Sequence, residues 1–227
     1  MKTNTEVNGD TPSRCSRTFS NAPGRPARWS QAASPDANRS NVAVGPAAGR
    51  GRTVPERRSV VGPPERILIL SDTHIPARAR DLPAPVWEAV DAADVVIHAG
   101  DWVSVAALDA LQARAVRLVG VFGNNDGDEL RARLPEVARV ELAGVRFAVV
   151  HETGSSKGRE KRCSTAYPDV DVLVFGHSHI PWDSTTVTGL RLLNPGSPTD
   201  RRRRPTHTWM TASVDDGTLG PVTLHHL

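Results

Sequence analysis

Three short apolar runs alternate with helix-like patterns between residues 66 and 134. Each run consists mainly of branched aliphatic residues and is followed at once by polar ones, which is typical of strands buried on both faces of a sheet. The runs lie at 66–71, 94–99 and 116–122, and the helical patterns at 84–93, 103–113 and 126–134. This β-α-β-α-β order predicts parallel strands joined by right-handed crossovers.

The pattern changes after Pro135, where strand-like segments follow one another more closely. Val137–Leu142 and Val145–Val150 flank Ala143-Gly144, an arrangement typical of a β-hairpin. A polar loop and a helix follow at 153–167, and strand-like runs lie at 170–175, 184–188, 190–193, 207–214 and 221–225. We therefore predict an α/β fold in which two mixed sheets form a sandwich with helices on the outside.

Residues 1–62 differ in composition from the rest of the chain. The first 65 residues contain no Leu or Ile, but they contain 8 Pro, and 10 Lys and Arg against 5 Asp and Glu. Such a segment cannot bury enough apolar surface to offset the entropy of ordering its backbone. We predict that residues 1–62 are disordered and that 63–227 form one domain. The segment could be a solvated arm, a transit peptide, or the product of a start site placed too far upstream.

The basic pI of about 9.3 belongs to this N-terminal segment, because the rest of the chain carries 18 Lys and Arg against 20 Asp and Glu. The segment lacks the interleaved aromatic residues of nucleic-acid stacking platforms, so we do not expect a nucleic-acid polymer as partner. The chain has no apolar run of 18 residues and no secretory signal pattern, and only Cys15 and Cys163 are cysteines. We therefore expect a cytoplasmic protein without a membrane partner.

Asp, Asn and His residues directly follow five of the predicted strands. The carboxyl ends of parallel strands meet at one edge of a sheet, so these side chains should lie close together. Carboxylate, amide and imidazole ligands suit Mn, Fe, Zn or Ni, and seven of them exceed the needs of one tetrahedral ion. The predicted ligands of two divalent metal ions are Asp72, His74, Asp101, Asn124, His151, His177 and His179.

Each of these motifs is a weak signal when it is taken alone. Asp72-Thr73-His74 could cap a helix, residues 123–127 could form an ordinary turn, and His151 could be a buried core histidine. It is their joint order, each after an apolar strand, that favours a metal centre.

Taken together, the motifs resemble the five sequence blocks of calcineurin-like metallophosphoesterases, in particular the small phosphodiesterases of the YfcE type. The resemblance covers residues 66 to about 200 and includes the turn Asn194-Pro195-Gly196-Ser197. The blocks that carry it are Ser71-Asp72-Thr73-His74, Gly100-Asp101, Gly123-Asn124-Asn125-Asp126, His151 and Gly176-His177-Ser178-His179. It implies a four-layer α/β/β/α sandwich of two mixed sheets flanked by helices.

The resemblance also implies a role for each ligand. Asp72, His74, Asp101 and His179 would hold one ion, and Asp101 would bridge to a second ion held by Asn124, His151 and His177. Manganese is common in the family, and iron, zinc and nickel also occur. The implied reaction is in-line attack on the phosphorus of a small phosphate ester by a hydroxide bridging the ions. Asp101, Asn124 and Asp126 are the predicted catalytic residues, with Asp126 orienting a ligand or water.

Two positions depart from the family pattern. Many members have a histidine where this chain has Asn125, and that histidine protonates the leaving oxygen. Its replacement favours diesters with good leaving groups, or protonation by water or another histidine. Glu152 stands where the family usually has glycine after the ligand histidine. It could add a carboxylate to the site, or it could point to solvent, since neighbours on an extended strand face opposite ways.

Arg201 and Arg202 begin a run of four arginines after Asp200. Such a run is usually a solvated surface, but these two could bind an anionic substrate through bidentate phosphate contacts. The leading prediction is a metal-dependent phosphodiesterase. A non-catalytic scaffold of the same fold, as in the retromer subunit of the family, and a phosphomonoesterase or nucleotide pyrophosphatase are the alternatives. The sequence leaves the oligomeric state open.

Overall fold

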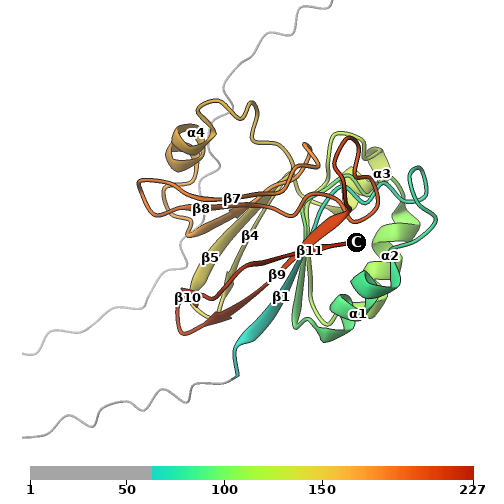
Figure 1. The fold of residues 1–227 in the computed structure, drawn as a ribbon, viewed down its shortest axis with the longest axis horizontal. Coiled ribbons are helices and arrows are strands. Elements are labelled where there is room, and N and C mark those ends of the chain that lie inside the picture. Colours follow the sequence, from blue (N-terminus) through green and yellow to red (C-terminus); the bar gives the residue numbers. More distant parts are fainter. Residues whose placement is uncertain (1–62) are drawn as a thin grey trace, which may run out of the picture. The chain divides into compact units, whose positions relative to one another are not determined.

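The computed structural model describes residues 63–227, which form two β-sheets with helices on their outer faces (Figure 1). The predicted disorder of residues 1–62 falls outside this range. The helices are α1 (Ala84–Ala92), α2 (Val105–Arg114), α3 (Asp128–Arg133) and α4 (Arg159–Ala166). The strands are β1 (Glu65–Leu70), β2 (Val95–His98), β3 (Leu118–Gly120), β4 (Val137–Leu142), β5 (Val145–Val150), β6 (Val172–Val174), β7 (Trp182–Thr185), β8 (Arg191–Asn194), β9 (Thr208–Asp215), β10 (Thr218–Leu219) and β11 (Thr223–His226).

Both sheets are mixed, as the sequence predicts. The first has the strand order β10-β9-β1-β2-β3, with β11 also paired to β9; β1, β2 and β3 are parallel, and β9 runs antiparallel to β1. The second has the order β4-β5-β6-β8-β7, in which β5, β6 and β8 are parallel. The predicted β-α-β-α-β unit and the hairpin of β4 and β5 are both confirmed.

Three apolar clusters account for the four layers. The central cluster joins the facing sides of the two sheets and includes Ile67, Ile97, Phe147 and Val174. A second cluster packs the other side of the first sheet against α1, α2 and α3, and a third packs the second sheet against α4. Because alternate residues of a strand face opposite ways, Ile67 and Leu68 belong to different clusters. Burial on both faces is why the strands read as continuous apolar runs.

Several segments differ from the sequence prediction, and two of them show why. The strand predicted at 116–122 shrinks to Leu118–Gly120, and Val116 is exposed. The strand predicted at 184–188 instead lies at Trp182–Thr185, because the chain turns after Thr186 with an amide of Gly189 donating to its carbonyl. Val187 is fully exposed in that turn, so its hydrophobic side chain marks no strand. Among the described helices, none is both long and apolar enough to cross a membrane.

Candidate metal centre

The predicted ligands come together where the strands of both sheets end. Loops after β1, β2 and β3 bring Asp72, His74, Asp101 and Asn124, and loops after β5 and β6 bring His151, His177 and His179. Three groups of these residues have ligand atoms within 4.8 Å of one another: Asp72–His74–His179, Asp72–Asp101–His151, and His151–Glu152–His177. The convergence expected from parallel strand ends is therefore present.

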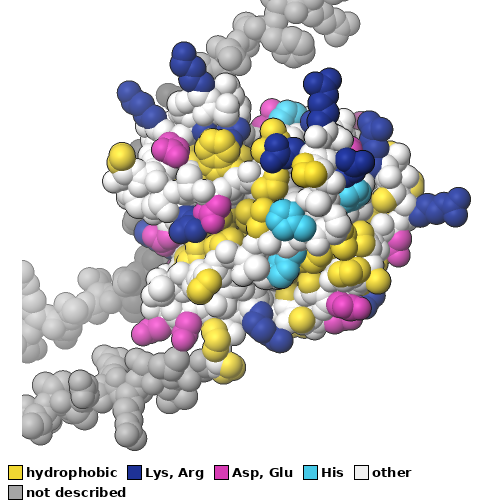
Figure 2. Space-filling model, viewed as in Figure 1, with side chains coloured by type: hydrophobic (Ala, Val, Ile, Leu, Met, Phe, Trp, Pro, Cys, Tyr) yellow, Lys and Arg dark blue, Asp and Glu magenta, His cyan; other side chains and the backbone are white. Residues whose placement is uncertain are grey.

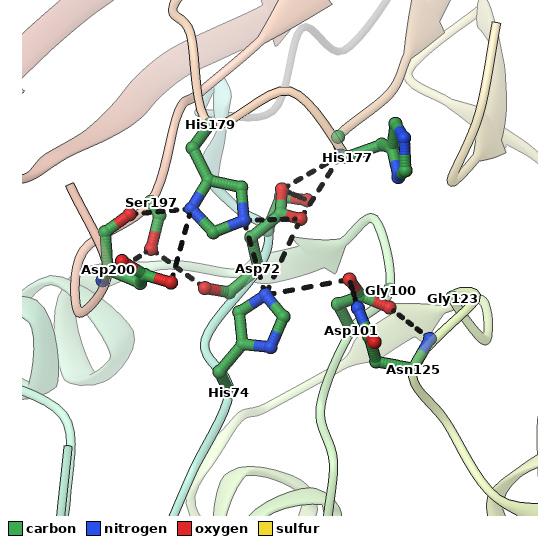
Figure 3. A network of polar contacts seen from close by, with 12 residues as sticks. Asp72, His74, Gly100, Asp101, Gly123, Asn125, His177, His179, Ser197 and Asp200 are labelled. Carbon is green, nitrogen blue, oxygen red and sulfur yellow. Dashed lines mark hydrogen bonds and ion pairs between the residues drawn. The ribbon is translucent and has the colours of Figure 1, made fainter. Parts of the chain in front are cut away.

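Two buried histidines and a buried carboxylate form the first cluster (Figure 3). The Nε2 atom of His179 lies 3.3 Å from Oδ1 of Asp72 and 3.2 Å from Nε2 of His74. His74 Nε2 also lies 3.5 Å from Oδ2 of Asp101. Both carboxylates are completely buried. Ligand atoms at these separations could share one divalent ion at ordinary bond lengths of about 2.0–2.2 Å.

The second cluster centres on the side-chain oxygen of Asn124. This oxygen lies 2.9 Å from His151 Nε2 and 2.8 Å from His177 Nδ1. His151 Nε2 is also 3.3 Å from Oδ2 of Asp101. The same Asp101 oxygen therefore faces a histidine of each cluster, which is the position that a bridging carboxylate requires.

Backbone carbonyls orient two of the histidines. His151 Nδ1 lies 2.7 Å from the carbonyl oxygen of Ala99, and His179 Nδ1 lies 2.6 Å from that of Asp200. A carbonyl can only accept, so Nδ1 carries a hydrogen in both rings, and Nε2 is the ring nitrogen that faces the clusters. Once Nε2 has lost its own proton, it can coordinate a divalent metal ion.

The electrostatics favour an ionised carboxylate at the centre. Burial alone would raise the pKa of Asp101, but hydrogen bonds from His151 and Asn125 hold it below its ordinary value. For His74, burial lowers the pKa, although the negative charges of Asp101 and Asp72 oppose this change. For His151, burial is outweighed by the hydrogen bond to Asp101 and the charge of Asp72, so its pKa is raised. A negative site with histidines beside it suits a cation.

The backbone at the ligands is strained. Five predicted ligands have left-handed backbone torsions, which residues other than glycine rarely adopt. Their φ values are 55° for Asp72, 45° for His74, 61° for Asp101, 68° for His177 and 55° for His179. Gly100 is also left-handed (φ 88°), and a Cβ there would lie 2.8 Å from the amide nitrogen of Gly123. Such strain at several neighbouring ligands is typical of a functional site.

The Asn194–Ser197 turn supports the Asp72 loop. Asn194 Nδ2 donates to the carbonyl of Gly176 (2.8 Å), and Ser197 Oγ donates to the carbonyl of Asp72 (2.7 Å). Ser71 Oγ donates to Asp72 Oδ2 (2.6 Å). The motif that contributed to the family resemblance thus fixes the loop of one ligand and the loop that precedes His177.

His98 contacts two of the loops that carry predicted ligands, those after β1 and β2. Its Nδ1 accepts from the amide of Gly100 (3.2 Å), its Nε2 lies 3.1 Å from Oγ1 of Thr73, and its ring stacks on Trp102. Burial lowers the pKa of His98 to about 3, so the ring is neutral. His98 is therefore a buried structural residue that joins the loops after β1 and β2.

Asp126 is held beneath Asp101 by backbone amides. Its Oδ2 accepts from the amides of Gly123 (2.7 Å) and Asp101 (3.1 Å), and its Oδ1 accepts from that of Val103 (2.7 Å). The carboxylate therefore joins the loops after β2 and β3. These contacts agree with the orienting role predicted for Asp126, because backbone amides already donate to both of its carboxylate oxygens.

The two departures from the family pattern have definite positions. Asn125 donates from its backbone amide and its side chain to the two oxygens of Asp101, at 2.9 and 2.7 Å (Figure 3). Glu152 Oε1 lies 3.6 Å from His177 Nδ1. Its carboxylate thus points toward the second cluster rather than away from it. The strand alternation does not apply here, because β5 ends at Val150.

Two hollows adjoin the clusters. One, of about 330 Å³, is lined by Asn124 and His151 together with Phe122, Tyr167 and their neighbours. The other, of about 380 Å³, is lined by His74, Ala77, Arg78, Val103, Asn125, Asp200 and Arg202. Among the described residues, the arginines that line this second hollow are Arg78 and Arg202.

Of the two arginines predicted to bind substrate, only Arg202 lines this hollow. Arg201 instead donates to the carbonyl of Arg204 (2.8 Å). Arg78, which pairs with Asp200 at 3.4 Å, was missed by the sequence prediction because no motif includes it.

Comparisons with known proteins were made for the sequence and for the fold. The sequence model of the calcineurin-like phosphoesterase superfamily domain matches residues 66–217. A probable metallophosphoesterase of Methanocaldococcus jannaschii is 34% identical over 158 residues, which are 69% of this chain and 80% of that protein.

Two solved structures show how far the likeness in fold extends. A Thermotoga maritima protein, TM1076, has a TM-score of 0.58 at 28% identity, covering 72% of this chain and 99% of its own. Vps29 of Entamoeba histolytica, solved with Zn²⁺, has a TM-score of 0.59 at 21% identity, covering 71% and 98%. At that identity, the second comparison concerns the fold alone.

Proposed function

Because the chain belongs to the calcineurin-like phosphoesterase superfamily, we propose that it is a two-metal phosphodiesterase that hydrolyses a small phosphate diester. Family membership supports a metal-dependent phosphoesterase. The observation that carries the finer proposal is the position of Asp101, whose Oδ2 lies 3.5 Å from His74 Nε2 and 3.3 Å from His151 Nε2. One carboxylate between two ligand clusters is the arrangement that a pair of metal ions requires.

We assign the ligands to the two ions as the resemblance to the family implies. Asp72, His74, Asp101 and His179 would hold one ion, and Asp101, Asn124, His151 and His177 the other. Divalent ions bound there would activate water at neutral pH and neutralise the charge of the phosphoryl group. Carboxylate, amide and imidazole ligands together suit manganese, with iron, zinc and nickel as the alternatives.

The protein's own residues would hold these ligands in place during the reaction. Asn125 holds both oxygens of Asp101 and leaves them ionised. Asp126 fixes the backbone of Asp101 and Gly123, so that the loops keep their spacing. Orientation of this kind before the substrate arrives is a major source of catalysis.

The two hollows support a diester as substrate. A phosphate diester has two organic substituents, and one hollow lies beside Asn124 and His151 while the other lies beside His74 and Asn125. The amide of Asn125 cannot protonate a leaving oxygen, which favours diesters with good leaving groups. Figure 2 shows acidic and basic side chains interspersed on the viewed face, and we propose a small ester rather than a nucleic-acid polymer as the partner.

Metal-dependent hydrolysis is the direct test of this proposal. We expect protein stripped of metal to be inactive toward bis(p-nitrophenyl) phosphate and to gain activity when Mn²⁺ is added. The rate should saturate near two ions per chain, as measured by titration. Absence of metal-stimulated turnover on any diester would contradict the proposal, and p-nitrophenyl phosphate assayed in parallel distinguishes a monoesterase.

The scaffold alternative makes a different prediction for the same experiment. The fold is shared with Vps29, so metal binding without hydrolysis of monoesters, diesters or pyrophosphates would favour an interaction protein. The complete ligand set favours the enzyme, since a scaffold would not need seven side chains arranged around two centres.

Arg202 should contribute to substrate binding, whereas Arg201 should not. Arg202 lines the hollow beside His74, while Arg201 is engaged with the carbonyl of Arg204. We expect Arg202→Ala to raise KM for a diester about tenfold with little change in kcat, as for the loss of one charge-assisted contact worth about 1.5 kcal/mol. Steady-state kinetics check this, with Arg201→Ala as the matched control. Equal effects of the two variants would contradict it.

The cytoplasmic location remains a proposal based on cysteine usage. Cys163 is buried and free in the described residues, and burial raises the pKa of its thiol, which disfavours reaction with oxidants.

A further inference from the structure

The carboxylate of Glu152 lies beside the second ligand cluster. Its Oε1 atom is 3.6 Å from His177 Nδ1, and one oxygen of Glu152 is within 4.8 Å of the ligand atoms of both His151 and His177. Within the part of the chain that the structure describes, His177 is the one basic group in ion-pair range of Glu152. Among the described residues, no Lys or Arg side chain therefore accounts for the direction of the Glu152 carboxylate.

The backbone around Glu152 is anchored. On one side, the carbonyl of His151 accepts from the amide of Gly176 (3.0 Å). On the other side, Arg162 of α4 donates to the carbonyls of Thr153 and Lys157, each at 2.8 Å. Glu152 thus extends from a held segment, and its side chain is half exposed at the edge of the cluster.

We propose that Glu152 is an additional carboxylate ligand of the metal ion held by Asn124, His151 and His177. This inference rests on the two-metal function proposed above and assigns a ligand that the glycine usual at this position cannot supply. The other ligands of this ion would be two imidazoles, one amide and the shared carboxylate of Asp101. A second carboxylate makes the cluster more negative and harder, which favours ions such as Mn²⁺ over Zn²⁺.

In the alternative role, Glu152 accepts a hydrogen bond from His177 Nδ1 and only orients that ring. The two roles differ in which His177 nitrogen faces the ion. The geometry favours direct ligation, because His177 Nδ1 points at Asn124 Oδ1 (2.8 Å) as well as at Glu152. His177 Nδ1 thus faces the side-chain oxygens of both Asn124 and Glu152. We expect these three atoms to bind the same metal ion.

Metal binding tests the proposal without reference to activity. Metal-stripped full-length protein would be titrated with Mn²⁺ and separately with Zn²⁺ by calorimetry, comparing Glu152→Gln with the native chain. We expect one of the two Mn²⁺ sites to lose about tenfold or more in affinity and the other to keep its native affinity. Zn²⁺ should lose less, since it depends less on carboxylate oxygens. The matched control is Glu160→Gln, which removes the same charge from an exposed position on α4.

A spectroscopic measurement separates ligation from orientation. The visible spectrum of Co²⁺ bound to the second site reports the number and type of its ligands, and it should change in Glu152→Gln but not in Glu160→Gln. Unchanged Mn²⁺ affinity, or an unchanged Co²⁺ spectrum, would overturn the proposal. Its failure is distinct from failure of the proposed function: two bound ions with no hydrolysis would refute the enzyme and leave the ligand assignment standing.

Discussion

Replacing Asp101 with asparagine is expected to lower the rate of diester hydrolysis by about 1,000-fold or more. Asp101 is completely buried, and its Oδ2 atom lies between His74 and His151. Loss of the shared negative charge should weaken both metal sites at once. If the ions supply about 4 kcal/mol of transition-state stabilisation, their loss corresponds to about three orders of magnitude in rate. Steady-state kinetics and metal content per chain should be measured together.

The control is Asp109→Asn, which removes an exposed carboxylate on α2 that pairs with Arg133 at 2.7 Å. That variant should retain the native rate, because an exposed ion pair contributes only about 0–1 kcal/mol and lies outside the ligand clusters. Full activity of Asp101→Asn with two ions bound would refute the bridging role. Full activity with one ion bound would refute the two-metal proposal.

The sequence could predict that these side chains converge, because the strands of a parallel sheet end at one edge. A buried strand reads as a continuous apolar run, and the first polar residue after it must leave the sheet at the carboxyl edge. Asp72, Asp101 and His151 each follow such a run, so their meeting needs only the strand order β1-β2 in one sheet and β5-β6 in the other. The facing of the two sheets, through residues such as Ile69 and Phe147, then brings the two edges together.

The sequence could not predict features that depend on how loops from different strands pass one another. Nothing in the motif at 123–126 indicates that Asn125 would hold both oxygens of Asp101, a contact between residues 24 positions apart. The sequence could not predict the direction of the Glu152 side chain, because that direction depends on where β5 ends. Arg78 and Arg202 meet at one hollow only through the paths of two long loops. The short β10 was also missed, since two residues carry no periodicity.

The second large effect is expected in stability, from Asp126→Asn. The carboxylate of Asp126 accepts from three backbone amides and is 3% exposed. An asparagine can present only one oxygen, so its NH₂ group must face at least one of these amides. Loss of a charge-assisted hydrogen bond and the unpaired donor should cost about 2 kcal/mol of unfolding free energy. That corresponds to a fall in Tm of roughly 4–8 °C for a domain of this size.

Urea and thermal unfolding of metal-stripped protein would measure this cost apart from any effect on metal binding. Asp128→Asn is the matched control, because Asp128 is exposed in the first turn of α3, where losing its charge should cost only about 0.3–1 kcal/mol. A native-like stability for Asp126→Asn would contradict the role of this carboxylate in joining the loops after β2 and β3. If activity were lost while stability and metal affinity stayed native, Asp126 would act on the reaction itself rather than by positioning Asp101.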